Sequence, residues 1–254
     1  RESELKELQK MMSYARRAAD AFNMIEEGDV IAVGVSGGKD SLTLLCTLHG
    51  LARFYPKHFT VVPINLRMGF PGEDDAPIRS LCESLGLELK SFESDIYSVV
   101  FDIRAEKHPC SLCANMRRGA LHAAAKECGC NKLALGHHMD DAAETILMNL
   151  FIEGRFDCFR PVTYLSRSEM TVIRPLLYAP EKEIKHFMRA NGLEAVPKCC
   201  PADGNTRRED TKKRLSELER TDRGLKQRIF NAFFVRELEK EEQLKNSGKE
   251  PQNG

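Results

Sequence analysis

An apolar run that leads through two adjacent glycines into a helix-forming segment constrains the fold more than any other feature of this 254-residue chain. Residues 30–35 form a short β-branched stretch that is typical of a buried strand. The sequence Ser-Gly-Gly-Lys-Asp-Ser follows at 36–41, and residues 41–51 have the apolar pattern of a helix. This order predicts a strand, a tight glycine turn and a helix, with backbone N–H groups of the turn directed at one bound anion.

The same alternation of strand and helix patterns continues along the chain. Further strands are expected at 60–66, 87–91 and 132–136, and further helices at 75–85, 110–128 and 141–151. This alternation predicts an α/β fold with an open, mainly parallel sheet and helices on both faces. In such sheets, ligands bind beyond the carboxyl ends of the strands.

Composition excludes several other classes of protein. The chain is 42% hydrophobic and 30% charged, which is close to the globular average and unlike a disordered or collagen-like chain. Its apolar runs are much shorter than the roughly 20 residues that cross a bilayer, and no signal-peptide layout is visible. We therefore expect a soluble cytoplasmic protein without a membrane partner. Because 38 basic and 38 acidic residues cancel, a nucleic-acid partner would need a local basic patch.

Four segments are expected from the composition along the chain. Residues 1–29 form an N-terminal helical segment, and residues 30–200 form the α/β domain that carries the chemistry. Residues 201–236 form a basic, helical C-terminal extension. The Glu/Lys-rich tail at 237–254 is expected to be disordered.

The turn at 36–41 has the properties of a phosphate site. Gly37 and Gly38 allow a tight turn, Lys39 adds a mobile positive charge, and Ser36 and Ser41 add hydroxyl donors. Its spacing fits neither the Walker A loop nor the Gly-x-Gly-x-x-Gly pattern of dinucleotide-binding proteins. The alternative is an ordinary strand-to-helix turn that happens to contain glycines. The order of strand, glycines, lysine, serine and helix favours phosphate binding.

A second polar turn, Gly-His-His-Met-Asp-Asp at 136–141, follows the fourth expected strand and therefore lies at the same edge of the sheet. Asp140 and Asp141 are suited to bind Mg²⁺, directly or through water. His137 and His138 are suited to donate hydrogen bonds to phosphates. The alternative is an aspartate pair that caps a helix start, but the nearby phosphate loop favours a nucleotide site.

Nine cysteines without an export signal are expected to be thiols or ligands rather than disulfides. Cys110 and Cys113 are three residues apart at an expected helix start, which places them on one face and would lower their pKa values. One of the adjacent pair Cys199 and Cys200 is expected to join them. The residues alone leave four roles open for these cysteines: a zinc site, a redox pair, an iron–sulfur site or buried thiols. Five further cysteines are expected to be packing residues: Cys46, Cys82, Cys128, Cys130 and Cys158.

A basic segment lies between residues 205 and 228, where nine basic and five acidic residues give a net charge of +4. A helix with these residues on one face would form a local patch for nucleic-acid phosphates, and basic residues around Cys110 would extend it. The alternative is a solvated helix with internal ion pairs. The candidate RNA-binding residues are Arg104, Lys107, Arg117, Arg118, Arg207, Arg208, Lys212 and Lys213.

Taken together, these motifs resemble the TtcA/TtuA family of the PP-loop ATP pyrophosphatase superfamily, and within it the branch of tRNA 2-thiocytidine synthetases. The resemblance covers roughly residues 10–235. It is carried by residues 22–29, the loop at 36–41, Cys-Ser-Leu-Cys at 110–113, Arg-Arg-Gly at 117–119 and Leu-Gly-His-His-Met-Asp-Asp at 135–141.

The resemblance implies an enzyme that cleaves ATP to AMP and pyrophosphate and thiolates C2 of a pyrimidine in tRNA, with cytidine favoured. It implies that Ser36, Gly37, Gly38, Lys39, Asp40 and Ser41 bind the phosphates of ATP. Asp40 would also have a catalytic role in orienting the metal or the base. Backbone groups at Asn65 and Leu66 would hold the adenine. Gly136, His137, Asp140 and Asp141 would contact the nucleotide, with the two aspartates near Mg²⁺.

The resemblance also implies a 4Fe-4S cluster on Cys110, Cys113 and Cys200, with one iron that has no cysteine ligand. Where the family typically has Pro-Cys-x-x-Cys, residues 197–201 read Pro-Lys-Cys-Cys-Pro, so Cys199 is an alternative ligand. The implied partners are a tRNA substrate, a sulfur donor such as a cysteine desulfurase, and a second copy of the chain.

Two rival functions remain open at this point. One is a PP-loop ligase or sulfurtransferase that acts on another substrate and has zinc-bound or structural cysteines. The other is a module that binds ATP or RNA without catalysis.

Overall fold

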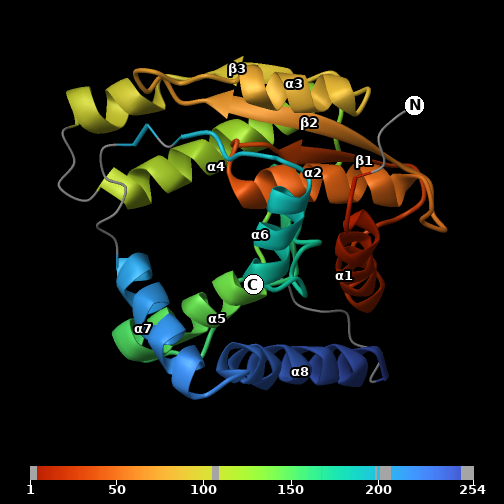
Figure 1. Cartoon of the computed structure of the whole chain (residues 1–254), viewed down its shortest axis with the longest axis vertical. Coiled ribbons are helices and arrows are strands. Elements are labelled where there is room, and N and C mark those ends of the chain that lie inside the picture. The colour runs from red at the N-terminus through yellow and green to blue at the C-terminus, as the bar shows by residue number, and fades with distance from the viewer. Residues whose placement is uncertain (1–4, 105–108, 167, 198, 201–206, 247–254) are drawn as a thin grey trace. The chain divides into compact units, whose positions relative to one another are not determined.

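The computed structural model describes residues 5–104, 109–166, 168–197, 199–200 and 207–246, which form two compact units. A six-stranded sheet forms the centre of the first unit (Figure 1). The strand order is β3-β2-β1-β4-β6-β5. The strands are β1 (Asp29–Gly34), β2 (Phe59–Arg67), β3 (Lys90–Glu93), β4 (Lys132–Ala134), β5 (Val162–Leu165) and β6 (Met170–Ile173). All neighbours are parallel except the edge pair β5 and β6, which is antiparallel. The expected mainly parallel α/β sheet is confirmed.

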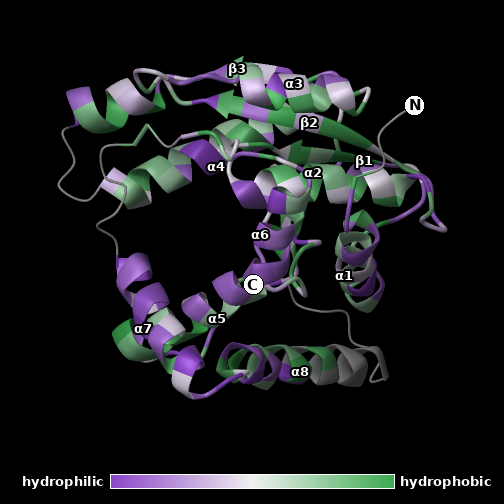
Figure 2. Cartoon of the chain, viewed as in Figure 1, coloured by the Kyte–Doolittle hydropathy of each residue, from purple (hydrophilic) through white to green (hydrophobic). Residues whose placement is uncertain are grey.

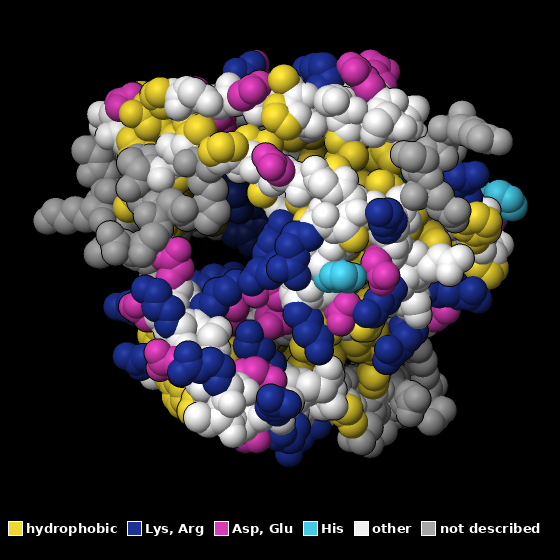
Figure 3. Space-filling view, viewed as in Figure 1, with side chains coloured by type: hydrophobic (Ala, Val, Ile, Leu, Met, Phe, Trp, Pro, Cys, Tyr) yellow, Lys and Arg dark blue, Asp and Glu magenta, His cyan; other side chains and the backbone are white. Residues whose placement is uncertain are grey.

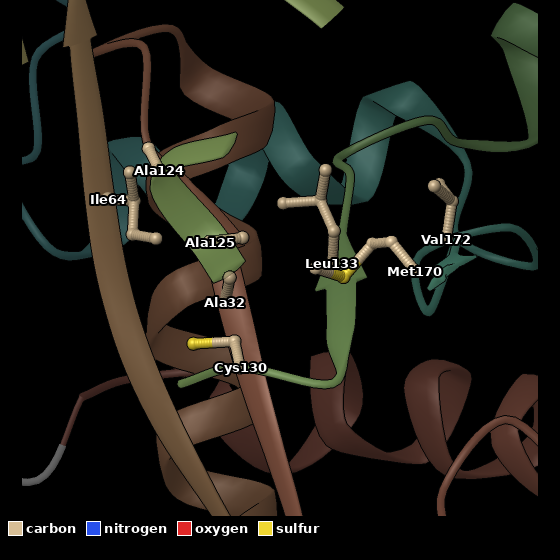
Figure 4. Close-up of a cluster of buried hydrophobic side chains, with 8 residues drawn as sticks. All are labelled: Ala32, Ile64, Ala124, Ala125, Cys130, Leu133, Met170 and Val172. Carbon is tan, nitrogen blue, oxygen red and sulfur yellow. The ribbon is translucent and has the colours of Figure 1, made fainter. Parts of the chain in front are cut away.

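One face of the sheet packs against α4 (Pro109–Glu127). Figure 4 shows the buried cluster on this face, in which small side chains of β1 and α4 lie close together. A Cβ built on Gly34 would lie 3.0 Å from Cδ2 of Leu121 of α4, so the absence of a side chain leaves room for this leucine against β1. The cluster comprises Ala32, Ile64, Ala124, Ala125, Cys130, Leu133, Met170 and Val172.

The opposite face of the sheet is covered by α2 (Lys39–Ala52). Side chains alternate along a strand, so Ile31 and Val33, both fully buried, point away from the α4 face. α2 itself packs against α1 (Leu8–Ala21) and α6 (Glu181–Ala190). Because it lies between the sheet and two helices, α2 is buried on almost every side. Figure 2 shows hydrophobic residues along β1 accordingly.

A buried ion pair joins the starts of β1 and β4. Lys132 Nζ lies 2.8 Å from Asp29 Oδ2, and both side chains are buried. Asn131 Nδ2 donates to Asp29 Oδ1 at 2.7 Å, and Lys132 also donates to the carbonyl of Met24 at 3.1 Å. These contacts satisfy a charge pair that would otherwise be costly to bury.

The remaining elements of the first unit are α3 (Ala76–Ser84) and the π-helical turn η1 (Ser98–Ile103). The four strands and four helices expected from the sequence are present, with ends displaced by up to a few residues. The hairpin of β5 and β6, the turn η1 and α6 were not expected.

The second compact unit comprises Met139–Arg160 with the chain from Gly204 onward. It contains α5 (Met139–Met148), the π-helical turn η2 (Asn149–Glu153), α7 (Arg207–Thr221) and α8 (Leu225–Asn246). α5 packs against both α7 and α8. Phe230 and Phe234 of α8 are buried with ring centroids 4.5 Å apart. The helix expected at 141–151 ends early, because the backbone widens into η2 at Asn149.

α8 differs from the expectation for the C-terminal tail. It continues through Asn246, well beyond residue 236, where disorder was expected to begin. Glutamate, lysine and leucine are strong helix formers, and they dominate this stretch. None of the helices in the described part of the chain has both the length and the apolar character that a membrane crossing requires.

Candidate functional site

The turn between β1 and α2 forms the expected phosphate loop. Gly38 is the N-cap of α2 and brings no side chain to the first-turn N–H groups, which have no partners within the helix. The Ser41 hydroxyl closes the loop, since it donates to the Gly38 carbonyl at 2.9 Å and accepts from the backbone N–H of Ser36 at 3.2 Å. This arrangement presents backbone donors and a helix N-terminus to an anion.

Gly37 joins this loop to the segment that carries the last two cysteines. Its φ is +77°, in the left-handed region that favours glycine. A Cβ on Gly37 would lie 2.6 Å from Cγ2 and 2.7 Å from Cβ of Val196. The backbone N–H of Val196 also donates to the Gly37 carbonyl at 2.9 Å. Contacts with a residue just before Cys199 thus fix the shape of the phosphate loop.

Charged side chains surround the start of α2. Lys39 Nζ lies 2.8 and 2.9 Å from the two Asp40 carboxylate oxygens and 3.2 Å from Glu181 Oε1 of α6. Burial lowers the pKa of Lys39, but hydrogen bonds and charge attraction from Asp40 and Glu181 outweigh it, and the net pKa is raised. Lys39 is therefore a protonated, partly buried cation beside the loop. His138 is buried, with Nε2 3.4 Å from Asp40 Oδ1.

The first part of the second polar turn lies against the phosphate loop. A Cβ on Gly136 would lie 3.0 Å from the carbonyl carbon and oxygen of Asp40, so a side chain here would press against the Asp40 backbone. Asn65 is buried and Leu66 is half-buried, and both lie on β2 beyond Ile64, the residue paired with the last residue of β1. The first unit therefore brings the loop, His138, Gly136 and the end of β2 to one edge of the sheet.

The two aspartates of the turn begin α5 in the second unit, where basic side chains of the C-terminal helices neutralise them. Asp140 Oδ1 lies 2.8 Å from Lys226 Nζ of α8. Asp141 Oδ1 lies 2.9 Å from an Arg208 nitrogen of α7. Glu144, one turn further along α5, is buried and also pairs with Arg208, at 3.4 Å. The acidic side chains at the start of α5 are thus held in ion pairs with basic side chains of α7 and α8.

Three cysteines of the first unit lie close enough to interact electrostatically. Burial raises the pKa of Cys113, Arg117 opposes this, and Cys200 and Cys110 raise it further. The lowering of the pKa that a helix start would cause is wrong for Cys113, because the residue is half-buried and desolvation dominates. Cys199 has a different neighbour: its Sγ lies 3.8 Å from the Pro197 carbonyl.

The described residues include no group of three or more His, Cys, Asp or Glu side chains that could hold a metal ion. In a 4Fe-4S cluster each thiolate binds its own iron, so the cysteines are spaced more widely than the ligands of a single ion. Cys110 is exposed, Cys113 and Cys200 are half-buried, and all three are free thiols. These three residues fit a cluster in donor chemistry, and Cys113 lies within electrostatic range of the other two.

The other cysteines have the environment of packing residues. Cys46, Cys82, Cys130 and Cys158 are buried, and Cys128 is half-buried. Burial raises the pKa of Cys46 to about 12 and those of Cys82 and Cys130 to about 11, which keeps these thiols protonated and unreactive.

The candidate RNA-binding residues differ in their surroundings. Arg104, Arg117, Arg118, Arg207 and Lys213 are exposed, whereas Lys107 lies outside the described residues. Arg208 and Lys212 face the acidic side of α5, with Lys212 Nζ 3.8 Å from Glu144. Figure 3 shows Lys and Arg side chains mixed with Asp and Glu over α7. Some cations of this helix therefore form ion pairs and others face solvent, and RNA binding by the exposed ones stays a prediction.

Sequence reasoning missed three residues of the site. Glu144 follows the aspartate pair by one helical turn, so the pattern Asp-Asp-x-x-Glu could have identified it. Glu181 and Val196 reach the phosphate loop from residues far along the chain. Nothing in their local sequence indicates this.

This combination of a parallel sheet, a glycine-rich strand-to-helix loop and a flanking polar turn defines a phosphate-binding α/β protein. Residues 9–218 match a protein-family model described as the PP-loop domain. The match covers most of the chain and includes the loop at 36–41, the paired cysteines and the turn at 136–141. The chain belongs to the PP-loop domain family.

The chain is also similar to individual proteins of known name. The chain is 40% identical over 230 residues to a tRNA-cytidine(32) 2-sulfurtransferase of Geobacter sulfurreducens, with 88% of each chain covered. It is 39% identical over 226 residues to a tRNA-cytidine(32) 2-sulfurtransferase of Ralstonia pickettii, covering 88% of this chain and 71% of that one. A similar solved structure is the U34-tRNA thiolase NcsA from Methanococcus maripaludis with its 4Fe-4S cluster. Its TM-score is 0.73 at 26% identity, covering 91% of this chain and 79% of that one.

Proposed function

We propose that this chain is an ATP-dependent tRNA sulfurtransferase that replaces the C2 oxygen of a cytidine, cytidine 32, with sulfur. The observation that carries the proposal is 40% identity over 88% of both chains to a relative named for this reaction. The phosphate loop and the three neighbouring cysteines supply the two chemical functions that such a reaction needs, activation of an oxygen and delivery of a sulfur.

The first step is adenylation of the base. The C2 oxygen attacks the α phosphorus of ATP, a P–O bond forms, and pyrophosphate leaves. Backbone N–H groups of the loop and the helix N-terminus bind the phosphates, while protonated Lys39 offsets their negative charge. Asp40 holds Lys39 and His138 beside the loop. Backbone groups at Asn65 and Leu66 hold the adenine.

Asp140 and Asp141 are the proposed ligands of Mg²⁺. Their carboxylates supply the oxygen donors that this ion prefers. Bound Mg²⁺ would neutralise charge on the departing pyrophosphate. Arg208 and Lys226 balance these carboxylates in the second unit.

The second step is sulfur transfer. Hydrosulfide sulfur adds to C2, the C2–O bond breaks, and AMP leaves with the original oxygen. Cys110, Cys113 and Cys200 are the proposed ligands of a 4Fe-4S cluster, in line with the cluster in NcsA. A cluster on these three residues would supply an iron without a cysteine ligand, available to bind the incoming sulfur. Cys200 is favoured over Cys199 because it interacts with Cys113, whereas Cys199 contacts Pro197.

Two partners complete the proposal. A sulfur donor such as a cysteine desulfurase supplies persulfide sulfur, which a thiol reductant converts to hydrosulfide as the thiol is oxidised to a disulfide, and a second copy of the chain forms a homodimer. Light scattering of the purified protein and of its mixture with a desulfurase tests both.

The function is tested with protein purified without oxygen, unmodified tRNA, ATP, Mg²⁺ and sulfide. Mass spectrometry of the digested tRNA is expected to show 2-thiocytidine, with one AMP and one pyrophosphate formed for each sulfur introduced. Cys200→Ser is expected to abolish the product, whereas Cys158→Ser, a buried packing position, serves as the matched control. Thiolation of a uridine, or AMP formation without any thionucleoside, would contradict the proposal.

A further inference from the structure

An open groove of about 650 Å³ lies beside α8 in the second unit, apart from the residues assigned to ATP, Mg²⁺ or cysteine chemistry. Phe156, from the segment after η2, forms one side of it. The groove is lined by Phe156, Arg228, Asn231, Ala232, Val235 and Arg236. Its volume lies within the range of sites that hold small organic ligands.

Phe156 is an anchored but accessible aromatic ring. Its ring centroid lies 5.5 Å from that of Phe233 in an edge-on arrangement, with an angle of 62° between the ring planes. Phe233 is buried and packs in turn against buried Phe234, 5.1 Å away. Phe156 itself remains 45% exposed. This contact holds the ring in place and leaves much of its surface open to a stacking partner.

Two arginines, Arg228 and Arg236, also line the groove, and none of its described lining residues is acidic. Arg228 is positioned by hydrogen bonds to the Asp222 carboxylate and to the Arg223 carbonyl at 3.1 Å. An aromatic ring beside two guanidinium groups is complementary to a nucleobase attached to a phosphate backbone.

We propose that this groove binds an unpaired nucleotide of the RNA substrate, with the base stacked on Phe156 and the flanking phosphates held by Arg228 and Arg236. The inference rests on the proposed function, because it takes tRNA as the substrate. It adds a contact that recognises unpaired nucleotides of a loop without reading their sequence, since every base has a stacking face.

The test measures binding of unmodified tRNA to the cluster-loaded protein by fluorescence anisotropy at several salt concentrations. Phe156→Leu keeps the apolar contact with Phe233 but removes the aromatic face, so binding is expected to weaken by about 5- to 100-fold. Phe156→Tyr is expected to bind like the unaltered protein. Arg236→Gln is expected to reduce the salt slope by about one. Phe151→Leu is the matched control, because Phe151 is an exposed aromatic of the same unit that does not line the groove.

Each outcome decides the matter. If the unaltered protein makes 2-thiocytidine while Phe156→Leu and Arg236→Gln bind tRNA normally, the groove assignment is overturned and the proposed function stands. If the unaltered protein neither binds nor thiolates tRNA, both fail together. If Phe156→Leu changes the oligomeric state in light scattering but not tRNA affinity, the groove is a protein interface. Equal losses in Phe151→Leu would show general surface binding and would also overturn the assignment.

Discussion

Replacing Gly37 by alanine tests whether contacts from the cysteine segment shape the phosphate loop. Two costs follow from the structure. Alanine at a φ of +77° costs about 1–2 kcal/mol, because the left-handed region crowds Cβ against the backbone. The new Cβ would also lie 2.6 Å from Cγ2 and 2.7 Å from Cβ of Val196, and such overpacking costs about 1–3 kcal/mol. We therefore expect Gly37→Ala to lower the free energy of unfolding by about 2–5 kcal/mol.

The matched control is the neighbouring glycine. Gly38 has a φ of −71°, and a Cβ there would meet only Ser36 Oγ, at 3.6 Å. Gly38→Ala should therefore change the stability by less than about 0.5 kcal/mol, as is usual for substitutions without strain or burial. Both variants are measured without nucleotide by urea unfolding followed by circular dichroism.

A double-mutant cycle separates the two costs. Val196→Ala removes Cγ2 but keeps the Cβ that lies 2.7 Å away, whereas Val196→Gly removes both atoms. Gly37→Ala should therefore be less destabilising in the Val196→Gly background by about 1–3 kcal/mol, with a smaller recovery in Val196→Ala. Equal stability of Gly37→Ala and Gly38→Ala, or no coupling to position 196, would refute the reasoning.

Three further predictions concern the approach of the two turns, the buried ion pair and the third cluster ligand. Gly136→Ala would place a Cβ 3.0 Å from the Asp40 backbone and should weaken ATP binding at least tenfold by calorimetry, whereas Gly119→Ala, in open space on α4, should leave it unchanged. Lys132→Met leaves Asp29 buried without its cation, so it should lower the free energy of unfolding in urea by about 3–5 kcal/mol. A decrease of less than about 1 kcal/mol would contradict the buried-pair argument. Cys200→Ser should lose most of the iron found in anaerobically purified protein, and Cys199→Ser should keep it; the reverse result would exchange the two assignments.

The sheet and its main helices could be predicted because their signal is local. β1 is a continuous β-branched run buried on both faces, and the loop after it contains the glycines and the lysine that a phosphate turn needs. The edge hairpin of β5 and β6 carries no such signal. Both strands are four residues long, and their conformation depends on pairing: β5 pairs antiparallel with β6, and β6 joins the sheet by parallel pairing with β4, which is far away in the sequence.

The residue types of the candidate site could be predicted from the sequence, whereas the ion pairs and the burial of these residues could be predicted only in part. The order of residues 36–41 predicts an anion site, and the aspartate pair predicts a cation ligand on the following helix; the cation site stays a prediction. The sequence could not show that Arg208 and Lys226 neutralise those aspartates, because ion pairs between helices depend on how the helices pack. Burial of Cys113 likewise reverses the pKa shift that its place near a helix start suggested.

Gly37 shows how local and distant information combine in one site. Its identity follows from the loop sequence, yet the reason that no side chain fits there is Val196, far along the chain. Val196 donates its N–H to Gly37 and directly precedes the Pro-Lys-Cys-Cys segment that brings Cys200 toward Cys113. A displacement of Val196 would therefore alter both the nucleotide loop and the third cysteine. Under the proposed function, adenylation and sulfur transfer depend on the same short segment, so substitutions at Val196 should affect ATP binding and iron content together.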